Sequence, residues 1–245
     1  MKHSSTSNAE DTHDSHSERG NFAVEAFEEL RRLIVQGRLA PGAWLVEADV
    51  AKRLRFGRTP TRTALQWLAR DGYVVAHSTG KKSRMRVAPL TKEDAKELFY
   101  IVGHIEGLAS LHTAALPAER RRRIAKELTA INAQLDAIAR GRKAEPDRIL
   151  DLDTRFHELI VCANAGPRLT ALHRSIKPLT KRYFRLYASA IVKELHFSVS
   201  EHSEIIRAIS LGDPKCVERA MQANWQQGAA RLANIIELFG EHGNW

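Results

Sequence analysis

The amino-acid sequence predicts a mostly α-helical protein, in which an N-terminal winged helix-turn-helix is followed by an antiparallel all-helical bundle. Apolar residues recur at helical spacing over most of the 245 residues, and short polar breaks with proline or glycine separate the later helices. In residues 73–90 the apolar period changes to two, which is typical of a β-hairpin. The predicted domains are therefore a winged helix-turn-helix over residues 21–88 and an all-helical domain over residues 89–245.

The first 20 residues are polar and rich in serine, histidine and aspartate, which predicts a disordered tail over residues 1–20. They lack the apolar stretch of a secretory signal, and no apolar run in the chain reaches the roughly 18 residues that a membrane span needs. The two cysteines, Cys162 and Cys216, favour thiols in a reducing compartment. We therefore expect a cytoplasmic protein without a membrane partner.

Basic residues are concentrated in the first domain. The chain has a net charge of +9, and residues 21–90 contain 13 Lys and Arg against 6 Asp and Glu, a surplus of seven. A local surplus of this kind is expected of a module that binds a polyanion such as nucleic acid.

Three helices are predicted before the hairpin. The first covers residues 22–36 and the second residues 47–54, both from helical apolar spacing. In the third, Thr59 has the hydroxyl of an N-cap, Pro60 suits the first helical position, and Gly72 suits a left-handed C-cap. Two short helices joined by a tight glycine-containing turn make a helix-turn-helix.

The third helix and the hairpin supply the residues that we expect to contact DNA. The first turns of the helix present polar side chains that can read bases in the major groove, where arginine pairs with guanine and glutamine with adenine. The basic hairpin is a wing whose cations can reach phosphates or the minor groove. A solvated basic face is the alternative for the helix taken alone. The predicted DNA-binding residues are Arg58, Thr61, Arg62, Gln66, Lys81, Lys82 and Arg84.

Three motifs in this domain are more specific: I-x-x-G-x-L-x-P-G-x-x-L at residues 34–45, R-T-P-x-R-x-A-L at residues 58–65, and L-x-x-D-G at residues 68–72. Together they resemble the DNA-binding domain of the GntR family of bacterial transcription regulators. The resemblance implies that the two arginines of the second motif contact the operator. The sequence departs from the family pattern at Gly57, where serine is usual, and at Thr63, where glutamate is usual.

After residue 90 the chain is predicted to be helical throughout. Thr91 and Asp94 suit a capping-box-like helix start, Asp213 suits the N-cap of the last helix, and a kink is expected near Pro178. The expected helices lie at residues 91–115, 118–140, 147–163, 168–188, 191–211 and 214–239.

Within this domain, Asp153 and His157 lie one turn apart on one helix, and His202 lies on another. A carboxylate and imidazoles that project from facing helices can bind a divalent transition metal. From the spacing alone, an ordinary hydrogen-bonded Asp–His pair is the more common alternative.

Four motifs resemble the FCD ligand-binding domain of the FadR subfamily of GntR regulators: D-x-x-F-H at residues 153–157, A-x-A-G at 163–166, E-H-x-x-I-x-x-A-I-x-x-x-D at 201–213, and A-M at 220–221. The resemblance implies a metal bound by one aspartate and three histidines, which helps to hold a small carboxylate effector. Three of those ligands are matched, by Asp153, His157 and His202.

Two departures concern this site. Asn224 stands where the resemblance places the third histidine, and Val102 stands four residues before Glu106, where many relatives have an arginine that binds the effector carboxylate. Asparagine is a poor ligand for zinc or nickel. Three alternatives are therefore open for the metal: the pocket binds a divalent ion with waters completing its coordination, binds it weakly, or holds none. A less acidic effector is a further alternative. We expect His104, Arg182 and Asn224 to face the effector pocket.

The sequence thus predicts a homodimeric transcription repressor, without catalytic residues, that binds a palindromic DNA operator and responds to a small metabolite. A dimer is expected because one recognition helix reads too few base pairs to be specific. Two alternatives remain, a metal-dependent helical-bundle enzyme around Asp153, His157 and His202, and a non-specific nucleic-acid-binding protein. An enzyme would leave the basic winged domain without a role, and salt titration distinguishes the second alternative.

Overall fold

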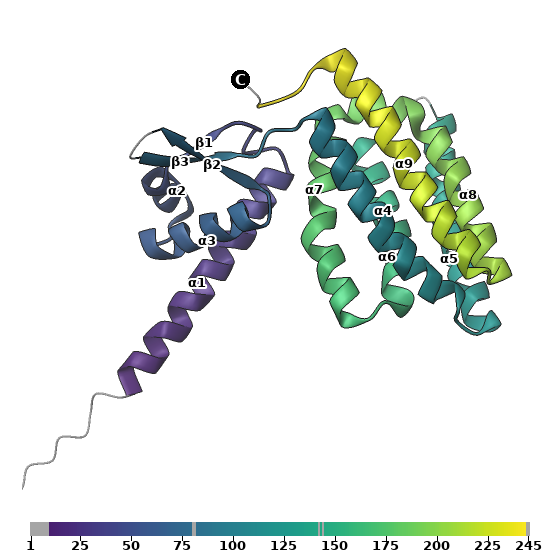
Figure 1. Ribbon diagram of the computed structural model, residues 1–245, viewed down its shortest axis with the longest axis horizontal. Coiled ribbons are helices and arrows are strands. Elements are labelled where there is room, and N and C mark those ends of the chain that lie inside the picture. Colours follow the sequence, from purple (N-terminus) through teal and green to yellow (C-terminus); the bar gives the residue numbers. More distant parts are fainter. Residues whose placement is uncertain (1–9, 80–81, 142, 144, 244–245) are drawn as a thin grey trace, which may run out of the picture. The chain divides into compact units, whose positions relative to one another are not determined.

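The computed structural model describes residues 10–79, 82–141, 143 and 145–243, and the chain divides into two compact units between Pro89 and Leu90. The fold class predicted from the sequence is confirmed, because a winged helix-turn-helix precedes an all-helical bundle (Figure 1). In the described part of the chain, no helix is long and apolar enough to cross a membrane.

The first unit combines helices with a small antiparallel sheet in the strand order β1-β3-β2. Strands β2 and β3 form the predicted hairpin, whose register runs from Val74 opposite Val87 to Thr79 opposite Lys82. Strand β1, which the sequence did not predict, pairs with β3 at the sheet edge. The elements are α1 (Glu10–Val35), β1 (Trp44–Leu45), α2 (Glu47–Leu54), α3 (Arg58–Arg70), β2 (Val74–Thr79) and β3 (Lys82–Val87).

The ends of two helices in this unit differ from the prediction. Helix α1 begins at Glu10, inside the segment expected to be a disordered tail, whereas residues 1–9 lie outside the described residues. Helix α3 has Gly57 rather than Thr59 as its N-cap, so the predicted start is wrong by two residues. Pro60 is still in the first turn, where its missing N–H is not needed. Gly72 has the left-handed backbone that the sequence predicted (φ +82°).

The second unit is a bundle of helices. The two predicted caps are confirmed: the Thr91 hydroxyl accepts a hydrogen bond from Asp94 N, and the Asp213 carboxylate accepts one from Cys216 N. A short 3-10 helix at Val192–Glu194 interrupts the segment predicted as one helix. The helices are α4 (Lys92–Ala114), α5 (Ala118–Arg140), α6 (Pro146–Asn164), α7 (Pro167–Ile191), α8 (Leu195–Leu211) and α9 (Pro214–Phe239).

Helix α7 contains Pro178, where the sequence predicted a kink, and has an irregular backbone further along. Its backbone departs from helical angles at Tyr187, nine residues beyond Pro178. The Tyr187 hydroxyl donates a hydrogen bond to Gly240 O at 2.7 Å, so the departure coincides with an anchor to the segment after α9. Tertiary contacts therefore decide the position of the irregularity.

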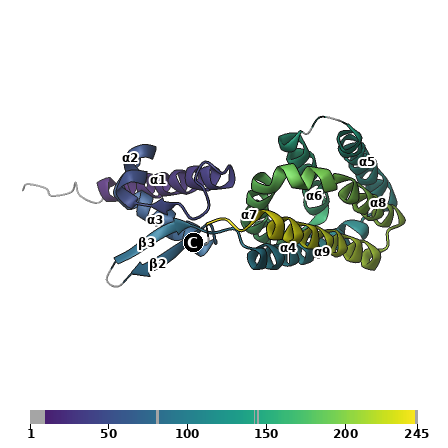
Figure 2. The same ribbon diagram turned by 90° about the horizontal axis from the view of Figure 1, so that it is seen from above.

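Helices α4 and α9 lie side by side, as both views show (Figures 1 and 2). Gly103 on α4 permits this approach, because a Cβ atom there would lie 2.8 Å from Trp225 Cβ on α9. Beyond α9, the backbone of His242 pairs with that of Leu90, directly before α4. The long helices thereby enclose the side chains that form the candidate site.

Candidate functional site

The outward face of α3 carries polar side chains. Arg58, Arg62 and Gln66 are exposed there, and Arg84 is exposed on β3 of the wing. Buried Ala64, on the opposite side of α3, belongs to the core of the first unit. An exposed row of guanidinium and amide groups along one short helix is the arrangement that base-edge recognition in a major groove requires.

Thr61 does not belong to this exposed face, although the sequence predicted it there among the DNA-binding residues. Its side chain is 1% exposed, and its hydroxyl donates a hydrogen bond to Gly57 O at 2.9 Å. A threonine hydroxyl in a helix readily bonds to the carbonyl four residues earlier, which turns it away from solvent. The predicted contacts at Lys81 and the side chain of Lys82 lie outside the described residues.

Arg62 is held by the preceding helix of the helix-turn-helix. Its Nε and Nη2 atoms donate to the two carboxylate oxygens of Glu47 at 2.9 and 3.0 Å. This bidentate ion pair fixes the plane of the guanidinium group. Because both side chains are substantially exposed, the pair adds little to stability, and its effect is to orient Arg62.

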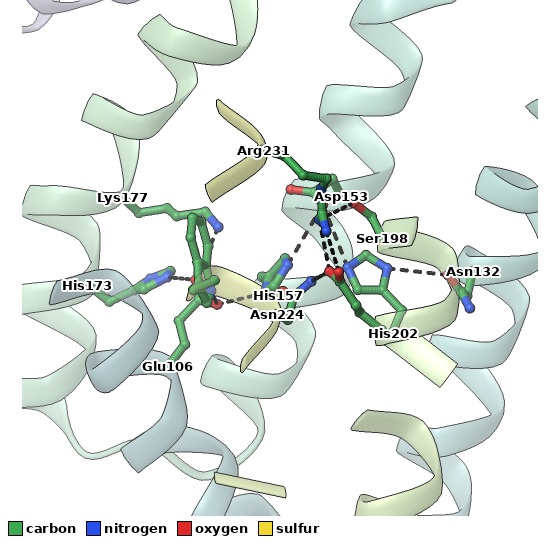
Figure 3. Close-up of polar contacts among 12 residues, drawn as sticks. Glu106, Asn132, Asp153, His157, His173, Lys177, Ser198, His202, Asn224 and Arg231 are labelled. Carbon is green, nitrogen blue, oxygen red and sulfur yellow. Dashed lines mark hydrogen bonds and ion pairs between the residues drawn. The ribbon is translucent and has the colours of Figure 1, made fainter. Parts of the chain in front are cut away.

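The predicted metal ligands come together in the bundle. Asp153 and His157 on α6 and His202 on α8 each offer one ligand atom, and these atoms lie within 4.8 Å of one another (Figure 3). Asp153 Oδ1 is 3.8 Å from the Nε2 atom of each histidine. The sequence prediction therefore selected three residues that share one site.

The histidine environments fit metal binding. His202 Nδ1 lies 3.3 Å from Asn132 Oδ1, and its buried Nε2 has no hydrogen-bond partner among the described residues. Burial, followed by the nearby His157, lowers the pKa of His202 to about 3, so the imidazole is neutral. His157 Nδ1 lies 2.6 Å from Glu106 Oε2, a carboxylate contact that orients a metal-binding imidazole. These three residues fit a divalent transition metal.

Glu106 is a central residue that the sequence reasoning did not assign to the site. It is fully buried, and it accepts hydrogen bonds from Trp225 Nε1 at 2.7 Å and from Lys177 Nζ at 3.1 Å, while His173 Nε2 lies 2.8 Å away (Figure 3). Burial alone would raise the pKa of Glu106, but His157 and Lys177 hold it well below its usual range. The carboxylate is therefore ionised.

Asn224, at the position of the expected third histidine, is buried beside this cluster. Its Nδ2 donates a hydrogen bond to Glu201 Oε2 at 2.7 Å, and Arg231 pairs with the same carboxylate. The amide nitrogen is thus engaged by Glu201. Among the residues that the structure describes, the site offers Asp153 and two histidines as metal ligands.

A cavity of about 120 Å³ opens onto this cluster. Its charged and imidazole side chains are those of Asp153, His157, Lys177, Lys181, Glu194 and Arg231. Its apolar walls come from α4, α6, α7, α8 and α9 and include Phe99, Ile149, Leu150, Phe184, Leu195 and Leu232.

Two of the three residues expected in the effector pocket are not among those that line the cavity. His104 is exposed and stacks on Tyr100, so it lies on the outer face of α4. Arg182 is buried on α7, but its neighbour Lys181 is the residue that lines the cavity. Both residues were predicted to face the pocket from the helical phase alone. Asn224 does line the cavity.

A winged helix-turn-helix with exposed base-reading side chains, in one chain with a helical unit that encloses a polar and apolar cavity, defines a ligand-responsive DNA-binding regulator. Residues 22–80 match the family model described as bacterial regulatory proteins, gntR family, and residues 101–227 match the FCD domain. The chain belongs to the GntR family, with an FCD effector domain. It is a transcription regulator and not an enzyme. FCD domains often bind metal, and Asp153, His157 and His202 offer such a site.

Known proteins of similar sequence are described as transcription regulators. A protein of Streptomyces ambofaciens, "Uncharacterized HTH-type transcriptional regulator in unstable DNA locus", is 30% identical, with 80% of this chain and 78% of that protein covered. The "Probable D-xylose utilization operon transcriptional repressor" of Paenarthrobacter nicotinovorans is 27% identical, with 77% and 78% covered. The solved structure of E. coli McbR/YncC has a TM-score of 0.65 at 18% identity, with 89% and 99% covered, which shows the shared fold.

Proposed function

We propose that this regulator is a repressor that binds a palindromic operator as a homodimer, and that a small carboxylate bound in the cavity changes its operator affinity. The observation that carries this proposal is the exposed Arg58, Arg62 and Gln66 row on α3. The effector can act only to the extent that it binds one arrangement of the two DNA-binding units better than another.

The two arginines are proposed to contact base edges, while Arg84 on the wing contacts the phosphate backbone. The Glu47 carboxylate already orients the guanidinium group of Arg62. Contact with guanine would exchange a solvent-exposed carboxylate for base acceptors of similar geometry, so little reorganisation is required.

The direct test is operator binding by the variants Arg58→Ala and Arg62→Ala. Each is expected to lose about 1–3 kcal/mol of specific binding free energy, which is roughly 5- to 150-fold in affinity. Fluorescence anisotropy with the operator and with a scrambled duplex measures both specific and non-specific binding. Arg70→Ala is the matched control, because Arg70 is exposed on the last turn of the same helix.

If Arg58→Ala and Arg62→Ala bind the operator as tightly as Arg70→Ala does, neither arginine reads the operator. If the wild type does not distinguish operator from scrambled DNA at any salt concentration, the protein binds DNA non-specifically and the proposed function fails.

For the helical unit, we infer a zinc or nickel ion held by Asp153, His157 and His202. When bound, the ion would supply positive charge for an acidic effector. The carboxylate of Glu106 orients His157, and the Asn132 amide orients His202, so both Nε2 atoms remain available. Nitrogen and carboxylate donors of this kind favour zinc and nickel over magnesium or calcium.

The proposed dimer uses the outer face of α4. Tyr100, Ile101 and Leu108 are 51%, 39% and 44% exposed, and their positions fall on one side of the helix over about two turns. Their exposure along one helix favours burial against a like surface, and a two-fold contact of this kind is self-complementary. Such a pair would bring two DNA-binding units into one molecule, as a palindromic operator requires.

A further inference from the structure

Three cations line the cavity of the helical unit, and two of them are neutralised by buried or half-buried carboxylates. Lys177 Nζ donates to Glu106 Oε1 at 3.1 Å and lies 4.0 Å from the centre of the Trp225 ring. Arg231 pairs with both carboxylate oxygens of Glu201. Each of these two cations is therefore already paired with a carboxylate of the protein.

Lys181 differs from these two. It lines the same cavity and is half-buried, yet its amine has no hydrogen bond or ion pair with any residue that the structure describes. Burial lowers the pKa of Lys181, Glu158 and Asp153 oppose that shift, and Lys177 and Arg185 add to it. An anionic group of a ligand placed beside this amine would favour its charged form.

The other side chains that line the cavity indicate the chemistry of the rest of the ligand. Phe99, Phe184 and Leu195 are among the apolar side chains that line it, and they come from α4, α7 and α8. A cavity of about 120 Å³ has room for a small organic molecule rather than for one water. A ligand that satisfies both parts has a single negative group at one end and an apolar body.

We propose that Lys181 is the residue that binds the charged group of the effector, and that this effector is a small monocarboxylate with an apolar body. The proposal rests on the proposed function, since it assumes that the cavity is the effector site. The wall residues then select for the length and shape of the apolar body.

The experiment measures ligand binding to the full-length protein by calorimetry and by thermal unfolding. The probes are straight-chain carboxylates from butanoate to octanoate, together with benzoate, each compared with its primary amide. The variants are Lys181→Met, which keeps the length of the side chain, Lys181→Arg, which keeps its charge, and Lys126→Met, which removes an exposed lysine from α5.

We expect at least one carboxylate to bind the wild type and to raise its Tm, with its amide at least tenfold weaker. Lys181→Met should lose about tenfold or more in affinity for the acid, while its affinity for the amide stays unchanged. Lys181→Arg should retain the preference for the acid, and Lys126→Met should behave as the wild type does. The proposal is overturned if no carboxylate of the series binds, if amides bind as well as acids, or if Lys181→Met binds acids as tightly as the wild type.

Operator binding by the wild type, measured in parallel, separates this inference from the proposed function. Specific operator binding together with equal carboxylate affinities of the wild type and Lys181→Met overturns only the role of Lys181. Loss of the difference between operator and scrambled DNA overturns the proposed function itself.

Discussion

Single residues set the charge balance inside the bundle. Glu106 neutralises Lys177, and Glu201 neutralises Arg231 and holds the Asn224 amide. A buried charge without a partner costs several kcal/mol, so pairing of this kind is expected in a folded core. What remains unpaired is then informative, because it marks groups available to a ligand.

Asn224→His is expected to strengthen metal binding by at least about tenfold, since an imidazole nitrogen is a far better ligand for zinc or nickel than an amide. Competition with a coloured chelator measures the affinity for each ion. Gln226→His, an exposed change on the same helix, is the control. Equal affinities for the two variants and the wild type would mean that position 224 does not reach the ion.

Lys181 also gives a prediction for pH dependence. Its pKa is lowered in the folded protein, so between that value and its ordinary value the unfolded chain binds more protons. The free energy of unfolding of the wild type, relative to Lys181→Met, should therefore rise with pH over the alkaline range below pH 10.5. Urea unfolding of both proteins across this range measures the difference. A flat or falling difference would show that the amine is as well solvated as in the unfolded chain.

The sequence could identify Asp153, His157 and His202 because helical spacing and motif position suffice for ligands on helix faces. It could not identify Glu106 or Lys181, since their roles depend on which helices pack together. Burial and pairing arise only from tertiary contacts. Thr61 shows the opposite error, because a hydroxyl placed by helical phase on the polar face instead bonds to its own backbone.

At the scale of elements, the contact between α4 and α9 builds the site. Glu106 and Phe99 come from α4, whereas Asn224, Trp225 and Arg231 come from α9. The Trp225 ring meets Phe99 at 5.1 Å between ring centroids and donates to Glu106. Close approach of the two helices therefore positions the second layer of groups around His157.

Gly103→Ala is expected to destabilise the protein by about 1–3 kcal/mol, because the added Cβ would lie 2.8 Å from Trp225 Cβ and the helices would have to separate. Gly228→Ala on α9 is the matched control: its Cβ would lie 3.7 Å from Phe99, an ordinary contact. Since alanine favours a helix over glycine, this control should gain up to about 1 kcal/mol. Urea unfolding measures both. Equal stability of the two variants would contradict the close packing.

The boundaries of several elements followed from the sequence, and others did not. Helices α2 and α5 have the predicted bounds, since apolar spacing and flanking turn residues agree there. The two-residue strand β1 is too short to show a period, and it exists only by pairing with β3. The irregularity at Tyr187 likewise depends on a distant partner, Gly240.

At the scale of the whole molecule, two of the helices that line the cavity, α7 and α9, are connected by hydrogen bonds to the residues directly before α4. The Tyr183 hydroxyl of α7 donates to Thr91 O at 3.1 Å, and His242, just beyond α9, pairs with Leu90. Leu90 directly follows the winged unit in the sequence. A ligand that shifts either helix would therefore act on the segment that joins the two units.

The proposed dimer gives a prediction for the whole molecule. Ile101→Glu places a charge on the exposed apolar face of α4, so the variant should be monomeric by light scattering, whereas Leu238→Glu, at an 81% exposed leucine of α9, should not change the mass. Linking two DNA-binding units raises avidity by roughly 10²- to 10⁴-fold. Ile101→Glu should therefore bind the palindrome at least about a hundredfold more weakly, yet bind a half-site duplex as the wild type does. A monomer that keeps full affinity for the palindrome would show that pairing does not contribute to operator recognition.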